Sequence, residues 1–428
     1  MYPRLAAVVA LVVLLGACTA PDVAPATTLP SSLPDALEPT EAVAGVVRTT
    51  SGDQTGNRMT AGTFDLAADP LRVELEVEPT WIVGGPVDSD TSVYVVVAAD
   101  GSVSAITVDE SGPARVMLDP QDSETPPVAV FGEGGYRLIR APAGSSVLTA
   151  PALVGSVVAS ITVEGEMTVV GDGGSTVVDV LGLGDSRLAV DERGLVAVLS
   201  DPTSQYPHGV VGDRVESATA TVVDAQSGDV VGVAVAPEGT VFETVAPLWG
   251  DVDGDGDTEL VLTASNGQEG ARLVVYDERG RLVASSASIG RGQRWRNQLG
   301  VADLDGVPVI VDVQTPHIGG IVQWFRIEGD ELVRVAATSE YSTHRLGRRN
   351  LDQGVIVDGD GDGALDVVVP SQDQQSLSAL RLDDGEVTEV RSIPLGSRLS
   401  TNLSAFTTPD GGASMALGLE DGSVFIWP

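Results

Sequence analysis

Two short stretches of this chain place acidic residues at alternate positions of a glycine-containing loop. Oxygen-rich loops of this kind suit Ca²⁺, which takes about six to eight oxygen ligands at roughly 2.3–2.6 Å, including backbone carbonyls and waters. The candidate metal ligands are Asp251, Asp253, Asp255, Asp257 and Glu259 in the first loop, and Asp358, Asp360, Asp362, Ala364 and Asp366 in the second. The alternative is a pair of Asp-rich turns without metal, in which the crowded carboxylates would repel one another.

The residues after each loop are apolar and favour β-structure: Leu260-Val261-Leu262 after the first, Val367-Val368-Val369 after the second. A helical calcium hand would instead need flanking amphipathic helices and a glutamate at position 12 of the loop. The sequence therefore predicts calcium loops inside a β-protein.

This loop-plus-strand pattern resembles the FG-GAP (or VCBS) repeat, known from integrin alpha-chain propellers and many secreted bacterial proteins. The loops match the family's D-x-D-G-D-G-x-x-D-L-V pattern, although Glu259 replaces the last aspartate of the first loop and the FG and GAP signatures are poorly kept. The resemblance implies a β-propeller with calcium bound between the first and second strands of a blade.

The N-terminus looks like a bacterial lipoprotein signal. Arg4 precedes an apolar run of eleven residues, 6–16, which is too short to span a bilayer as a helix. Leu15-Gly16-Ala17-Cys18 follows and resembles a lipobox, and Cys18 is the one cysteine of the chain. We expect residues 1–18 to be the signal peptide and the mature chain to start at a lipidated Cys18. The protein would then be anchored in the cell envelope, outside the cytoplasmic membrane or on the outer membrane; the alternative is an ordinary signal cleaved nearby.

The rest of the chain divides into a tether and one repeat domain. Residues 19–60 are rich in Pro, Thr, Ser and Ala, so we expect a disordered tether. Residues 61–428 hold short Val-rich runs between Gly, Asp and Asn turns, with no helical period. The expected fold is therefore all-β.

Seven copies of the turn after a first strand can be aligned, starting at residues 88, 132, 191, 251, 303, 358 and 409. Their spacing predicts a propeller of seven four-stranded blades, with six or eight left open because 127–185 is irregular. The spare apolar run at 71–77 should pair with the last blade and close the ring. The loop at Asp303 keeps two carboxylates, so we expect an empty turn there.

The net charge is −37 and every basic residue apart from histidine is an arginine, which argues against nucleic-acid binding. The loops expected opposite the calcium loops nevertheless gather basic and aromatic residues. They could bind an anionic ligand such as an acidic glycan, or the arginines could pair with carboxylates of neighbouring blades. The ligand-face candidates are Arg291, Arg294, Trp295, Arg296, His317, Tyr341, His344, Arg345, Arg348 and Arg349.

No catalytic motif stands out: Gly-x-Ser-x-Gly and His-Glu-x-x-His are both absent. The leading hypothesis is a calcium-binding, envelope-anchored propeller that serves as a non-catalytic binding or scaffold module for a protein or polysaccharide. The alternatives are a polysaccharide lyase or hydrolase that uses the Arg/His/Tyr face, and a lipoprotein of the envelope assembly machinery.

Overall fold

The computed structural model describes residues 43–209, 213–304 and 306–428. The expected signal peptide, the lipidation site Cys18 and residues 19–42 of the expected tether lie outside these ranges. The described residues form strands joined by turns, with no α-helix among them, as the sequence predicted. No helix in the described ranges is long and apolar enough to cross a membrane.

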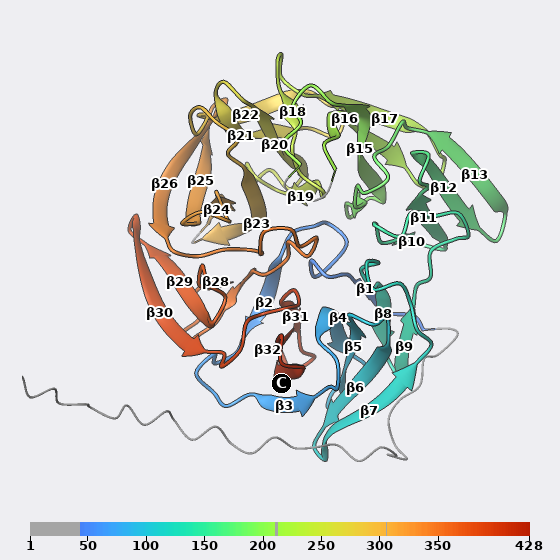
Figure 1. Cartoon of the computed structure of the whole chain (residues 1–428), viewed down its shortest axis with the longest axis vertical. Helices are drawn as coiled ribbons and strands as arrows, with labels where there is room; N and C mark the ends of the chain where they lie inside the picture. The colour runs from blue at the N-terminus through green and yellow to red at the C-terminus, as the bar shows by residue number, and fades with distance from the viewer. Residues whose placement is uncertain (1–42, 210–212, 305) are drawn as a thin grey trace, which may run out of the picture.

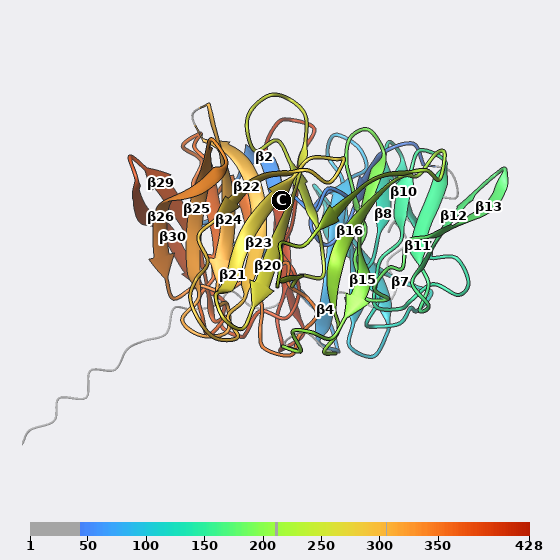
Figure 2. The ribbon, with the colours of Figure 1, turned by 90° about the horizontal axis from the view of Figure 1, so that it is seen from above.

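The described strands form six hydrogen-bonded sheets, and the largest, of 13 strands, consists of three neighbouring groups linked by short pairings. Eight groups of mainly antiparallel strands thus stand around a common centre (Figure 1). Seen edge-on, the strands run through the thickness of the ring and their turns gather on its two faces (Figure 2). The first group contains β4 (Pro79–Pro86), β5 (Ser92–Ala98), β6 (Val103–Asp109) and β7 (Gly112–Leu118), and the second contains β1 (Val46–Arg48), β8 (Ala129–Gly132) and β9 (Gly135–Leu138). The third group contains β10 (Ala152–Val154), β11 (Val157–Ile161), β12 (Glu166–Gly171) and β13 (Gly174–Asp179). The fourth contains β14 (Ala189–Val190), β15 (Leu195–Thr203), β16 (Glu216–Asp224) and β17 (Val230–Val235).

The other four groups complete the ring. They contain β19 (Leu248–Gly250), β20 (Glu259–Asn266), β21 (Gly270–Tyr276) and β22 (Leu282–Ser286); β23 (Arg296–Leu304), β24 (Val307–Gln314), β25 (Ile321–Glu328) and β26 (Glu331–Ser339); β27 (Val355–Asp358), β28 (Asp366–Pro370), β29 (Ser376–Asp383) and β30 (Glu386–Pro394); β31 (Ser404–Thr407), β32 (Ala413–Gly418), β33 (Ser423–Trp427) and β3 (Leu71–Glu74). The short strand β18 (Val241–Phe242) bridges β16 and β20, and β2 (Met59–Thr63) pairs in parallel with β27.

The Val-rich runs are explained by sheets that are covered on both faces. In β5, Val93, Val95 and Val97 pack into one hydrophobic cluster, whereas Tyr94 and Val96 pack into the cluster on the other side of the sheet. A strand buried on both faces is apolar throughout rather than at every second position. The core of the ring is therefore a set of layers between neighbouring blades.

The number of groups is eight, one more than the seven expected. Six of the seven predicted turns join the first and second strands of their group, and the turn at 132 joins β8, the middle strand of its group, to β9. The missed turn is Gly155-Ser156, between β10 and β11, which carries no acidic residue to mark it. It lies within the irregular region 127–185, next to the small group of β1, β8 and β9.

The ring closes as predicted. Strand β3 pairs antiparallel with β33, from Leu71 opposite Ile426 to Glu74 opposite Ser423. The last group thus takes its outer strand from the N-terminal side of the chain, and this pairing covers the edge of β33.

The expected tether is too long, because residues 43–60 belong to the folded ring. Strand β1 pairs with β8, and residues 49–58, which we call the central segment, then contact the innermost strands of several blades. The backbone N–H groups of Val190, Trp249 and Ile356 donate to carbonyls of residues 54, 55 and 58, at 2.7, 2.9 and 2.7 Å. The central segment therefore fills the middle of the ring.

Side-chain amides extend these contacts. The amide of Gln54 donates to the carbonyl of Leu153 and accepts from its N–H, both at 2.8 Å. The amide of Asn57 does the same with Val301, both at 2.9 Å. Each amide thus behaves as one more residue of a strand ladder, which explains how a polar segment can occupy the centre of a β-protein.

Candidate metal centre and ligand face

The first acidic loop lies between β19 and β20 and is wrapped around Asp251. The two carboxylate oxygens of Asp251 accept N–H bonds from Gly254 and Gly256, at 2.7 and 3.1 Å. Both glycines have positive φ, 80° and 93°, which other residues rarely adopt. Glu259 closes the loop by accepting from the N–H of Val252 at 3.0 Å. This fold brings carboxylate oxygens of Asp251, Asp253 and Asp255 within 4.8 Å of one another.

The second acidic loop, between β27 and β28, repeats the same bonds. Asp358 accepts from Gly361 and Gly363, each at 2.8 Å, and Asp366 accepts from Gly359 at 3.1 Å. Oxygens of Asp358, Asp360 and Asp366 converge within 4.8 Å. The other predicted ligands, Asp257, Glu259, Asp362 and Ala364, are not in either convergent set, and neither is Asp303.

The two loops differ in the cation that faces them. On β29, Arg381 pairs directly with Asp366, and its guanidinium donates to Asp366 at 2.8 Å, to Asp360 at 2.9 Å and to Asp362. In the blade of the first loop, Leu260 pairs with Tyr276, so the position across from Glu259 is Asp277. An acidic residue thus stands where the second loop has Arg381. Among the described residues, the guanidinium that pairs with an aspartate of the first loop is that of Arg193, 3.8 Å from Asp257. One guanidinium therefore partly neutralises the four carboxylates of the second loop from within, and the first loop has no equivalent among the described residues.

The pKa of Glu259 reflects this surplus of charge. Burial is the largest cause that raises it, and the carboxylates of Asp253, Asp255 and Asp251 add to it, so the pKa reaches about 7 despite the N–H bond from Val252. Arg381 could not be predicted as a partner of this loop, because its place opposite Asp366, 15 residues earlier in the chain, depends on the register of a hairpin.

Three of the six predicted ligand-face arginines are ion-paired across the ring. Arg345 pairs with Glu420, Arg348 with Glu78 at 3.0 Å, and Arg349 with Asp185 at 3.2 Å. Their partners belong to three different parts of the ring, so residues 344–350, which we call the capping loop, tie these parts together on the face opposite the acidic loops. For these three arginines the structure favours blade pairing over ligand binding.

Other ligand-face candidates are buried. Trp295 and Arg296 are each 3% exposed, and Arg296 donates to Asp312 at 2.6 Å and to Gln323 at 2.7 Å. The hydroxyl of Tyr341 donates to Glu389 at 2.7 Å. Of the predicted arginines, Arg291 and Arg294 are the exposed ones.

Under the capping loop, an aromatic cluster joins three of the candidates. The rings of His317 and His344 lie 4.5 Å apart, and Trp295 lies 4.9 Å from His344 and 6.0 Å from His317. Burial lowers the pKa of His317 to about 4 and holds the pKa of His344 well below its ordinary value, so both rings are neutral at pH 7. Among the described residues, the histidines do not form a convergent set of metal ligands.

Two glutamates near this cluster were missed by the sequence reasoning. Ser217 on β16 pairs with Phe242 on β18, which makes Glu216 and Glu243 neighbours across the two strands. Glu243 bonds the Nδ1 atom of His208. Burial, followed by the charges of Glu243 and nearby aspartates, raises the pKa of Glu216 to about 9. No motif marks these residues, because strand pairing alone brings them together.

Replacing Glu216 by glutamine should make stability less dependent on pH. A folded-state pKa above the ordinary value means that the native chain holds a proton that the unfolded chain releases, so wild-type stability falls as pH rises from about 4.5 towards 9. We expect Glu216→Gln to raise the free energy of unfolding by about 1–3 kcal/mol at pH 8 and to change it little at pH 4.5. Denaturant unfolding at both pH values measures this. The exposed Glu166→Gln is the control, and an equal gain at both pH values would contradict the prediction.

A pocket of about 560 Å³ adjoins these residues and has polar groups of Gln205, Tyr206, Asn266, Gln268 and Arg291 in its lining. The ring of Tyr206 lies 5.6 Å from that of His208. Tyr206 therefore links this hollow to His208, and through His208 to Glu243.

Comparison with known proteins leads to the fold. No family model and no curated protein matches the chain. Among solved structures, it is similar to quinohemoprotein alcohol dehydrogenase from Comamonas testosteroni, at a TM-score of 0.56 and 12% identity over 89% of this chain and 80% of that one. A europium-containing methanol dehydrogenase gives 0.56 and 12% over 87% and 90%. The chain is a β-propeller. At such low identity these matches say nothing about its activity.

Proposed function

We propose that this chain is a calcium-binding β-propeller of the cell envelope, anchored through Cys18, that binds a protein partner and carries out no chemistry. The observation that carries the proposal is the closed centre. The central segment fills the middle of the ring, and the capping loop ties its parts together on one face. Because the centre is closed, the partner would bind to the exposed surface of the ring.

The first acidic loop fits one Ca²⁺. Asp251, Asp253 and Asp255 supply converging oxygens, and no arginine occupies the space between them in the described part of the chain. In the second loop Arg381 already bonds three carboxylates, so a cation would have to displace a guanidinium. We therefore assign the calcium to the first loop. The ion would balance its charge and hold it in shape.

A protein partner fits the capping-loop face better than an acidic polysaccharide does. Three of the arginines expected to bind anions are paired, and Trp295 is too buried to stack on a sugar. Ile318 and Leu346, by contrast, are 82% and 72% exposed. Both adjoin the aromatic cluster, because Ile318 follows His317 and Leu346 lies two residues after His344, whose rings are in contact. Exposed apolar side chains beside polar ones are typical of protein interfaces.

The test is a double substitution, Ile318→Asp with Leu346→Asp, in the full-length anchored protein. We expect the partner that cross-links to the wild-type protein in intact cells to be lost, with an unchanged melting temperature because both side chains are exposed. Val163→Asp is the matched control, since Val163 is 71% exposed in a different blade. Retention of the same partner by the double variant would contradict the proposal.

A second candidate function is an enzyme acting on acidic polysaccharides. The observation that favours it is the group formed by Glu216, Glu243 and His208 beside the pocket of about 560 Å³. A carboxyl group kept protonated by burial can serve as a general acid. The test is turnover of a uronate-containing polysaccharide by the wild-type chain, with loss in Glu243→Gln. No turnover in either protein would exclude this candidate for that substrate class.

A further inference from the structure

A groove of about 700 Å³ opens on the acidic-loop side of the ring, at the seam where the ring closes. It is lined by the turn between β4 and β5, the turn between β31 and β32, the end of β6, and residues 63–71. We propose that this groove binds a basic segment of a partner protein, whose Lys or Arg side chains lie against its acidic residues.

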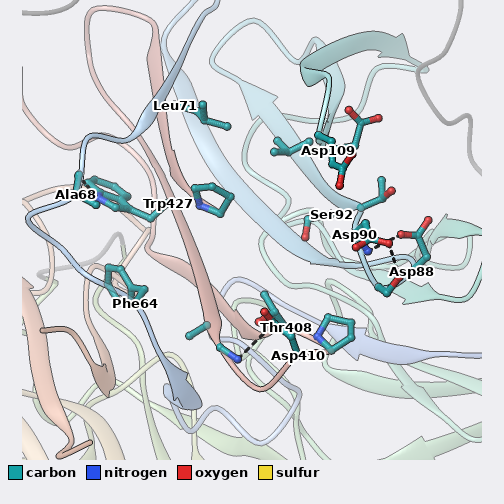
Figure 3. A pocket seen from close by; sticks show the side chains of 18 of the residues that line it. Phe64, Ala68, Leu71, Asp88, Asp90, Ser92, Asp109, Thr408, Asp410 and Trp427 are labelled. Carbon is teal, nitrogen blue, oxygen red and sulfur yellow. Dashed lines mark hydrogen bonds between the residues drawn. The ribbon is translucent and has the colours of Figure 1, made fainter. Parts of the chain in front are cut away.

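One side of the groove is apolar and held firmly. Phe64 and Trp427 pack edge to face with ring centroids 6.5 Å apart, and the indole N–H of Trp427 donates to the carbonyl of Ala68 at 3.0 Å. Figure 3 shows Phe64, Ala68 and Trp427 across the groove from Asp88, Asp90 and Asp109. Phe64 and Trp427 are themselves buried, so the apolar surface open to a ligand on this side is that of Ala68, Leu71, Pro409 and Pro428. Such a surface can cover the aliphatic stems of Lys or Arg, whose charged ends reach a polar surface.

The other residues around the groove bring a large negative charge. Seven of its lining residues are acidic and none is basic: Asp65, Asp69, Asp88, Asp90, Asp109, Glu110 and Asp410. Among the described residues, the arginine paired with them is Arg391, 3.9 Å from Asp65. The others that have partners bond neutral groups, as Asp410 does with the hydroxyl of Thr408 at 2.6 Å. On the opposite face, by contrast, Glu78, Asp185 and Glu420 are each paired with an arginine.

These charges fit an extended cationic group better than a metal ion. The carboxylates around the groove form no convergent set of the kind found in the acidic loops, so they are spread along it. The volume falls within the range of about 300–1,000 Å³ usual for ligand sites. A segment with several positive charges and aliphatic stems matches both the acidic and the apolar sides.

The occupant is not this chain itself. Residues 19–42 carry four acidic residues and no basic one, so that segment would be repelled. A second copy, with its net charge of −37, would be repelled as well. A basic segment of a different protein remains. This surface is separate from that around Ile318 and Leu346, so its failure would leave the proposed function standing.

The experiment measures binding of a labelled peptide of alternating Lys and Leu, about eight residues long, to the full chain by fluorescence anisotropy. The groove variant is Asp69→Asn with Glu110→Gln, two exposed side chains that make no hydrogen bond within the described part of the chain. The control is Glu166→Gln with Glu386→Gln, exposed acids elsewhere that change the net charge equally.

We expect the groove variant to raise the Kd about tenfold and the control to change it less than about twofold, with the Kd rising in salt. A Lys-only peptide should bind more weakly, because it leaves the apolar side uncovered. No binding by the wild-type chain, equal loss in both double variants, or equal binding of the Lys-only peptide would overturn the proposal. The last two outcomes would indicate general charge attraction only.

Discussion

Replacing Asp352 by alanine is expected to destabilise the protein by about 3–5 kcal/mol, because it leaves buried guanidinium groups without a counter-charge. Asp352 is fully buried and pairs with Arg58 at 3.1 Å and with Arg187, while the hydroxyl of Thr50 donates to it at 2.8 Å. It therefore joins the central segment, the start of the β14 blade and the capping-loop side of the ring. Denaturant unfolding measures the loss.

The dependence on pH distinguishes this network from simple packing. Its positive partners hold the pKa of Asp352 below the ordinary value even though burial opposes them. A lowered pKa means that the stabilisation is present above the unfolded pKa, about 3.9, and is lost as pH falls through the folded one. The difference between wild type and Asp352→Ala should stay constant from pH 8 to 5 and shrink below pH 4. Glu166→Ala, an exposed control, should change stability by less than about 0.5 kcal/mol. If Asp352→Ala also lost less than about 0.5 kcal/mol, the result would contradict the account.

Removing residues 43–58 is expected to abolish cooperative folding. The deletion takes away Arg58 from Asp352 and leaves backbone groups of Leu153, Trp249 and Val301 without partners in the centre. At about 1–3 kcal/mol for each buried group left unpaired, together with the broken ion pair, the cost is comparable to the roughly 5–15 kcal/mol that stabilises a whole domain. Calorimetry and far-UV circular dichroism measure the result.

Two further variants make this prediction specific. A chain that starts at residue 43 keeps the central segment and should melt like the full mature chain. Asn57→Ala removes only the paired bonds to Val301 and should cost about 1–3 kcal/mol. A deletion variant that still melts cooperatively near the wild-type temperature would show that the ring stands without its central segment.

The parts of the fold that depend on local pattern could be predicted from the sequence. The two acidic loops, the strands that follow them and the closing strand β3 are each marked by neighbouring residues. The eighth blade was missed because its first turn, Gly155-Ser156, carries no acidic residue. The central segment was missed because its composition is that of a linker, and its amides find their partners only once the ring exists.

The candidate sites depend more on distant contacts. Arg348 and Glu78 are 270 residues apart in the chain, so sequence could offer two roles for this arginine without deciding between them. Arg381 is set against the second loop by hairpin register, and Glu216 meets Glu243 through the short strand β18. Pairings of this kind follow from the closed ring rather than from any motif.

Calorimetric titration of the mature chain with Ca²⁺ tests the central claim most directly. The account predicts one site per chain, lost in Asp251→Asn and kept in Asp358→Asn, because the guanidinium of Arg381 occupies only the second loop. In Arg381→Gln, a second site should appear as the carboxylates around it lose their internal cation. No heat of binding in the wild-type chain, or a single site that survives Asp251→Asn, would contradict the account.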